Sequence, residues 1–304
     1  MIADFDEFCL WGYVVVDELW GQLPAAYKPS HGPVPGCSDS ELITMALLGE
    51  CRGWRQETML LRCWRERPDL FPVVPERTRF NRRRRDLAQA INAIRQATLA
   101  VLDVAQDRRC AIDSLPLPVM QFHLVPGAPA AATWRAEGAD FGKVPTKQQT
   151  IFGYKLHLLV TLGGVIRDFA LAPASASDVA VGAELLHEQA DLTVLGDKAS
   201  ISAPLAAALR AERGVDLLTV PRRNQRRQLP AAVARCRNAA RQIVETVNDQ
   251  LTEQFGLAHH HAHTFQGLCA RLATKLAAHT LCLYLNRLLG NADWLQIKPL
   301  AFPN

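Results

Sequence analysis

The sequence lacks any apolar run approaching the roughly 18 residues that a membrane-spanning helix requires. Its first residues, "MIADFDEFCLWGY", are acidic where a signal peptide is basic, so we expect no signal peptide. The eight cysteines are scattered without a C-x-x-C pair, which argues against a disulfide framework or a zinc site and favours a reducing cytoplasm. Internal repeats are also missing. The 304 residues, 49% of them hydrophobic, therefore predict a globular protein with one large and one smaller region.

Basic residues are unevenly distributed along the chain, although its net charge is only +4. Residues 52–95 contain twelve arginines and five acids, and residues 222–241 contain seven arginines and no acid. The rest of the chain is net acidic. Two separate basic segments favour localised contacts with a polyanion such as nucleic acid, whereas a solvated helix face is the alternative for any single arginine.

The first third of the sequence has helical patterns. In "SDSELITMALLGE", Ser38 and Glu41 have the spacing of a capping box, which predicts the start of a helix. Residues 78–105 read as one long helix with an apolar face. We therefore expect an all-helical N-terminal DNA-binding region over residues 1–105, which could contact DNA in the manner of a helix-turn-helix.

From residue 106 the pattern changes to that of an α/β region, expected to extend to residue 290 and to be followed by a tail over 291–304. Gly163 and Gly164 predict a hairpin between the second and third strands. The Ala/Pro/Gly-rich residues 124–150 are expected to form a surface loop. The five predicted strands cover residues 109–113, 153–161, 164–172, 192–196 and 215–220, and helices are expected over 176–190, 202–213, 231–255 and 264–289.

Two aspartates follow predicted buried strands, Asp113 in "AIDSLPLPV" and Asp197 in "LGDKASI". Side chains from separate strands converge at the carboxyl ends of strands in an α/β sheet. A third acid, Glu245, lies on a polar strip of the helix "RQIVETVNDQL". Three converging carboxylates without nearby histidine or cysteine favour Mg²⁺ or Mn²⁺. Taken singly, an aspartate after a strand is more often a cap, and Glu245 could be only the ion-pair partner of Arg241.

These motifs, with "FGYKLHLLVTLGGVI", "PASASD", "TVPRRNQ" and "KLAAHTLCLYLNRLLG", resemble the bacterial insertion-sequence transposases of the DDE type, and the resemblance covers nearly the whole chain. It implies a ribonuclease-H-like mixed five-stranded sheet flanked by helices, with Asp113, Asp197 and Glu245 as catalytic residues that hold two Mg²⁺ or Mn²⁺ ions. Members of the family usually have a glycine and an aromatic residue after "GDK", where this chain has Ala199 and Ser200.

The resemblance further implies a nucleoid-associated enzyme that cuts DNA at inverted-repeat ends and joins the 3′-OH to target DNA, as a homodimer or larger synaptic complex. A catalytically impaired DNA-binding relative and a nuclease of the same fold without strand transfer are the alternatives. Basic residues beside the predicted site and within the two basic segments are expected to contact phosphates. These residues are Lys155, Lys198, Arg82, Arg83, Arg84, Arg85, Arg222, Arg223, Arg226, Arg227 and Arg241.

Overall fold

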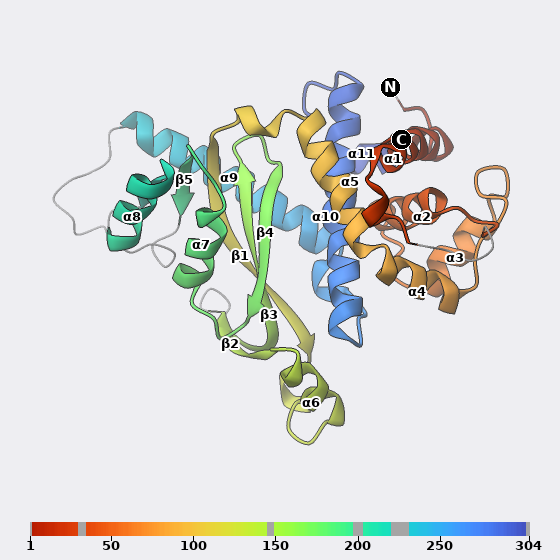
Figure 1. Cartoon of the computed structure of the whole chain (residues 1–304), viewed down its shortest axis with the longest axis horizontal. Helices are drawn as coiled ribbons and strands as arrows, with labels where there is room; N and C mark the ends of the chain where they lie inside the picture. Colours follow the sequence, from red (N-terminus) through yellow and green to blue (C-terminus); the bar gives the residue numbers. More distant parts are fainter. Residues whose placement is uncertain (1, 30–34, 145–148, 197–202, 220–230, 302–304) are drawn as a thin grey trace. The chain divides into compact units, whose positions relative to one another are not determined.

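The computed structural model describes the chain except for residues 1, 30–34, 145–148, 197–202, 220–230 and 302–304 (Figure 1). Contacts divide the chain into two units: a helical unit of residues 1–102 and 250–304, and an α/β unit of residues 103–249. Residues 250–290 thus belong to the helical unit, whereas the sequence pattern had assigned them to the α/β region. The physical reason is that the last long helix, predicted over residues 264–289, is buried against other helices.

The helical unit is built from both ends of the chain. Its N-terminal part contains α1 (Phe5–Gln22), η1 (Ala25–Tyr27), α2 (Asp39–Cys51), α3 (Glu57–Arg65), α4 (Arg77–Asp86) and α5 (Ala88–Val101). Its C-terminal part contains the π-helical turn η5 (Gln250–Gln254), η6 (Leu257–His259), α10 (Phe265–Leu288) and α11 (Lys298–Ala301).

The predicted capping box begins α2. The Ser38 hydroxyl accepts a hydrogen bond from the backbone N–H of Glu41 at 3.1 Å, and a Glu41 carboxylate oxygen accepts one from the N–H of Ser38 at 2.6 Å. This reciprocal pair satisfies two N–H groups that have no partner within the helix. The start of this helix was therefore correctly predicted from two side chains three positions apart in the sequence.

The prediction of one long helix over residues 78–105 is wrong in one respect, because this segment forms two helices. Leu87 separates α4 from α5 with ψ near 1°, outside helical geometry, and its side chain is fully buried. α4 packs against α2 and α10, whereas α5 packs mainly against α10 and α1. A straight helix would align one apolar face, so the break at Leu87 lets the two segments bury different faces.

Helix α10 is buried on almost every side, which is the pattern of a central helix. Among the described residues, no helix is both long and apolar enough to cross a membrane. The burial includes His279, whose Nε2 lies 2.9 Å from the amide oxygen of Gln250. Loss of solvation in this position lowers the pKa of His279 to about 4.

This lowered pKa predicts that acid destabilises the protein. Below about pH 6.5 the unfolded chain binds a proton that the folded His279 does not, so the free energy of unfolding should fall. Between pH 7 and pH 5 the loss should be about 2 kcal/mol from this residue. Urea unfolding of the wild type and His279→Gln at both pH values measures it. An equal loss in the two proteins would contradict the assignment.

The α/β unit contains a mixed sheet with helices on both faces. Its strands are β1 (Arg109–Met120), β2 (Asp140–Val144), β3 (Gln149–Thr161), β4 (Ile166–Pro173), β5 (Thr193–Gly196) and β6 (Asp216–Thr219). Its helices are η2 (Val104–Gln106), η3 (Phe122–Leu124), α6 (Pro129–Ala136), α7 (Asp178–His187), α8 (Ala203–Arg213) and α9 (Ala231–Asp249).

The sheet order is β2–β3–β1–β5–β6, with β4 also paired to β3. β3 runs antiparallel to both β1 and β4, while β5 and β6 extend the sheet in parallel from β1. The predicted hairpin between β3 and β4 is confirmed, and Gly164 has φ of +82°, which glycine adopts without strain. This mixed sheet, with a helical region before it, has the predicted ribonuclease-H-like fold class.

A sixth strand, β2, is a correction to the five predicted. Residues 124–150 were expected to be a loop, but they include α6 and β2, and β2 pairs with the first residues of β3. Trp134 of α6 is buried and packs edge-on against Tyr154, with ring centroids 6.4 Å apart. One buried tryptophan in a segment rich in small residues gives too little periodicity to predict either element.

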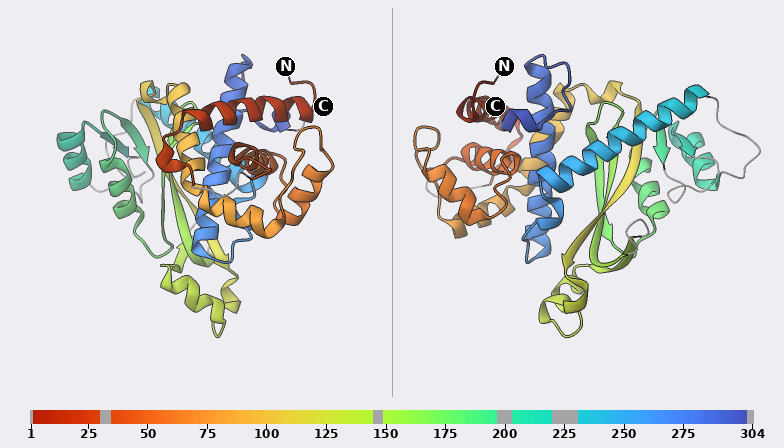
Figure 2. Two further views of the ribbon diagram at one scale, coloured as in Figure 1. Left: turned by 45° about the vertical axis from the view of Figure 1, so that its right-hand side comes forward. Right: turned by 180° about the vertical axis from the view of Figure 1, so that it is seen from behind.

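The two faces of the sheet have different helical cover. Cys110 and Ile112 of β1 belong to a buried apolar cluster with Leu185 and Leu186 of α7. α9 packs against β1, and Val244 and Val247 of α9 are buried. Figure 2 shows α9 crossing one face of the long strands and α7 on the other. The helix predicted over 231–255 is α9 to Asp249, followed by the π-helical turn η5.

Candidate functional site

Asp113 lies within β1 and points away from the α7 face. Successive side chains in a strand point to opposite faces, and its neighbour Ile112 is in the cluster with α7. Asp113 therefore belongs to the face that α9 covers. Its side chain is half-buried and lies opposite Leu158 of β3. Because Asp113 lies inside a strand, the alternative that its carboxylate caps a turn or a helix does not explain it.

The α9 helix supplies two polar side chains next to this carboxylate. The Nδ2 of Asn248 donates a hydrogen bond to Oδ2 of Asp113 at 2.7 Å. Glu245 lies three residues earlier, hence on the same side of the helix. The Glu245 carboxylate is 56% exposed and accepts a hydrogen bond from Nε of Arg241 at 2.8 Å. β1 and α9, which carry the first and third predicted acids, are thus packed together.

Asp197 and Lys198 lie outside the described residues, but the strand that precedes them is described. β5 ends at Gly196, and Gly196 pairs in parallel register with Ile112. The paired residues Ile112 and Gly196 therefore immediately precede the two predicted aspartates, Asp113 and Asp197. Arg222, Arg223, Arg226 and Arg227 also lie outside the described residues.

The arginines of α4 do not form one surface, which corrects the prediction that all four face DNA. Arg83 and Arg84 are 8% and 2% exposed. Arg83 bonds to Asp39 at 2.7 Å, and Arg84 bonds to Glu57 at 2.5 Å. A helix places residues 100° apart, so four consecutive arginines cannot share a face. Arg82 is exposed and Arg85 is half-buried, and these two remain as candidates for phosphate contacts.

Lys155 of β3 is held inside the α/β unit. Its ammonium group donates to Asp178 Oδ1 at 2.5 Å and to the carbonyl of Ala176 at 2.6 Å. The neighbouring His157 is buried, but its Nε2 has no hydrogen-bond partner and lies 3.8 Å from the same Asp178 oxygen. Burial lowers the pKa of His157, so the ring is neutral at pH 7. A phosphate contact of Lys155 would have to compete with this ion pair.

A divalent cation is a chemical match for the acids of the α9 face. Asp113 and Glu245 offer hard oxygen ligands from two packed elements, and no thiol or imidazole is needed to explain them. Within the described residues no group of three histidine, cysteine or acidic side chains lies close enough to hold an ion. The second predicted aspartate is not among the residues searched, so the described part of the site is two acids and Asn248.

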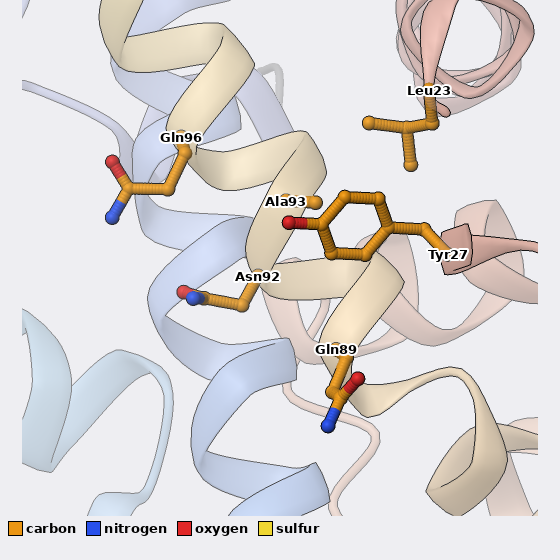
Figure 3. Close-up of a pocket in the computed structure, with 6 residues that line it drawn as sticks. All are labelled: Leu23, Tyr27, Gln89, Asn92, Ala93 and Gln96. Carbon is orange, nitrogen blue, oxygen red and sulfur yellow. The ribbon is translucent and has the colours of Figure 1, made fainter. Parts of the chain in front are cut away.

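A pocket of about 460 Å³ in the helical unit is separate from these acids. Figure 3 shows carboxamide side chains from successive turns of α5 beside the phenol ring of Tyr27. None of the predicted site residues lines it. Its walls are Leu23, Tyr27, Gln89, Asn92, Ala93 and Gln96.

The sequence model of a protein family described as "Transposase DDE domain" matches residues 105–281 of this chain. The match covers more than half of the 304 residues, so the chain belongs to the family of transposase DDE domains. No curated protein and no solved structure matches the chain. The family assignment confirms the resemblance to DDE-type transposases and gives the chain a transposase-type function.

Asn248 is the site residue that reasoning from the sequence missed. It follows the predicted glutamate by three positions, which is the spacing of neighbours on one side of a helix. This spacing was the signal in the sequence that could have identified Asn248. However, an asparagine on a helix carries no charge, and its contact with a strand 135 residues away depends on tertiary packing.

Proposed function

We propose that the protein is a DNA transposase that hydrolyses phosphodiester bonds at the ends of a mobile element and joins the freed 3′-OH to target DNA. The observation that carries this proposal is the pairing of Gly196 with Ile112, because each residue directly precedes a predicted catalytic aspartate. The chain continues from these two paired residues of adjacent parallel strands into the predicted aspartates Asp113 and Asp197. Glu245 lies on α9, the helix that packs against β1.

Asp113, Asp197 and Glu245 would hold two Mg²⁺ or Mn²⁺ ions. When bound, such ions supply Lewis acidity that activates a hydroxyl nucleophile and stabilises the oxygens of the attacking and leaving groups. The carboxylates have to be ionised to act as ligands, and their mutual repulsion has to be offset by the cations. Arg241 gives the exposed Glu245 side chain a charged partner through its 2.8 Å hydrogen bond.

DNA is the proposed partner, and the membership in the transposase family implies DNA binding. Arg82 and Arg85 are the described candidates for phosphate contacts in the helical unit, and Arg222, Arg223, Arg226 and Arg227 are proposed for the second basic segment. We propose a homodimer or larger complex that brings two element ends together.

The salt dependence of DNA binding tests these contacts. A double variant Arg82→Ala/Arg85→Ala should weaken binding to all DNA sequences and reduce the slope of log K against log salt concentration by about 2, one for each lost phosphate contact. Fluorescence anisotropy at salt concentrations from about 50 to about 200 mM measures this slope. Arg108→Ala/Arg213→Ala removes equal charge at exposed positions outside both basic segments and is the matched control. An unchanged slope in the first variant would remove these two residues from the interface.

The reaction itself is tested with DNA that carries the short inverted repeats flanking the gene. One assay measures cleavage of these ends in the presence of Mg²⁺ or Mn²⁺, and a second offers pre-cut ends with a free 3′-OH and measures joining to a plasmid. Cleavage with joining supports a transposase. Binding without cleavage would overturn the enzymatic proposal, and cleavage without joining would limit it to a nuclease.

A further inference from the structure

Asn248 of α9 forms a side-chain hydrogen bond with Asp113, the predicted metal ligand in β1. Its Nδ2 lies 2.7 Å from Oδ2 of Asp113, and both side chains are partly buried. The neighbouring Val247 is fully buried, and Val244 is 6% exposed, so α9 is fixed against the sheet on both sides of Glu245. The position of Asn248 is therefore set by packing rather than by the hydrogen bond alone.

We propose that Asn248 is a positioning residue of the catalytic site, which orients the Asp113 carboxylate as a ligand of the proposed cation. This inference rests on the proposed function. A side-chain amide donates a hydrogen bond to one carboxylate oxygen without adding charge. Lysine or arginine at 248 would instead neutralise Asp113 and compete with a cation, and a carboxylate would repel it.

One helix, α9, supplies hydrogen-bond partners for both acids, Asp113 and Glu245. Arg241 holds Glu245 from four residues away, and Asn248 holds Asp113 from the same side of the helix, three residues beyond Glu245. The exposed glutamate has a charged partner, and the half-buried aspartate has a neutral one. Partners that orient metal ligands in this way commonly affect metal affinity or activity by about 10–100-fold.

The test is Mn²⁺ binding by the full-length, DNA-free protein, followed by the electron paramagnetic resonance signal of free Mn²⁺. Asn248→Ala should raise the dissociation constant by about 10–100-fold. Asn248→Leu keeps a similar side-chain size without a donor and should show the same loss, which separates the hydrogen bond from packing. Asn238→Ala, at an exposed position earlier on α9, is the matched control and should bind Mn²⁺ like the wild type.

The variant Asp113→Ala distinguishes failure of the proposed metal site from failure of the proposed role of Asn248. Wild-type Mn²⁺ affinity in Asp113→Ala would mean that the ion binds elsewhere and would overturn the proposed metal site. Loss of affinity in Asp113→Ala with wild-type affinity in folded Asn248→Ala or Asn248→Leu would overturn only the role of Asn248. Thermal melts without metal establish that each variant is folded, and Asn248→Leu decides the question if Asn248→Ala does not fold.

Discussion

Replacing Asp113 by alanine should lower the rate of DNA cleavage by about 10²–10³-fold, the range found when one group that stabilises a transition state is removed. Binding to DNA ends should persist, because phosphate contacts come from basic side chains rather than from this acid. The Asp113 carboxylate lies on the α9 face of β1, where Asn248 holds it. Its loss removes a proposed ligand without removing apolar packing.

Single-turnover cleavage in Mg²⁺ and binding of uncut DNA in Ca²⁺ or without metal measure the two properties separately. Asp140→Ala is the matched control, because Asp140 is an exposed aspartate in the same sheet, at the start of β2. Asp197→Ala and Glu245→Ala should resemble Asp113→Ala. If Asp197→Ala cleaves at the wild-type rate, the three acids do not form one catalytic site.

Local signals in the sequence predicted most of the elements of the fold. The capping box at Ser38 and the glycine turn at Gly164 each involve residues that are close in sequence, so their outcome depends little on distant packing. The helix predicted over 231–255 likewise corresponds to α9 and the turn η5. The break at Leu87 and the strand β2 were missed because each depends on which distant segment packs against it.

The sequence proposes which acids form the site, but it does not indicate which side chains restrain them. Asp113 and Glu245 were identified from their order in the chain, and the structure places them on packed elements. The contact of Asn248 with Asp113 joins α9 to β1 and has no local pattern. The run Arg82 to Arg85 illustrates the same limit, because charge alone does not indicate which members of a run are exposed and which are buried.

Arg84, one of the arginines predicted from the sequence to contact DNA, instead has a structural role beside Glu57, together with Arg271. One oxygen of the Glu57 carboxylate lies 2.5 Å from Nη2 of Arg84 and 2.7 Å from Nη2 of Arg271, and Asn81 donates to both oxygens at 2.8 Å. Glu57 is 7% exposed and Arg271 is also 7% exposed. Burial, with a smaller contribution from repulsion by Arg271, lowers the pKa of Arg84 to about 10, and Glu57 opposes that shift.

Glu57→Gln should therefore lower the free energy of unfolding by about 3–5 kcal/mol, because it leaves two buried guanidinium groups without a counter-charge. Arg84 still has to be protonated at pH 7, so the cost cannot be avoided by losing its proton. Urea unfolding measures the change, and Glu66→Gln, at an exposed position beyond the end of α3, is the matched control and should change stability by less than about 0.5 kcal/mol. A loss below about 1 kcal/mol in Glu57→Gln would mean that solvent reaches Arg84 and Arg271. In that case Arg84 would return as a candidate for binding DNA, and the division between the buried and exposed arginines of α4 would have to be revised.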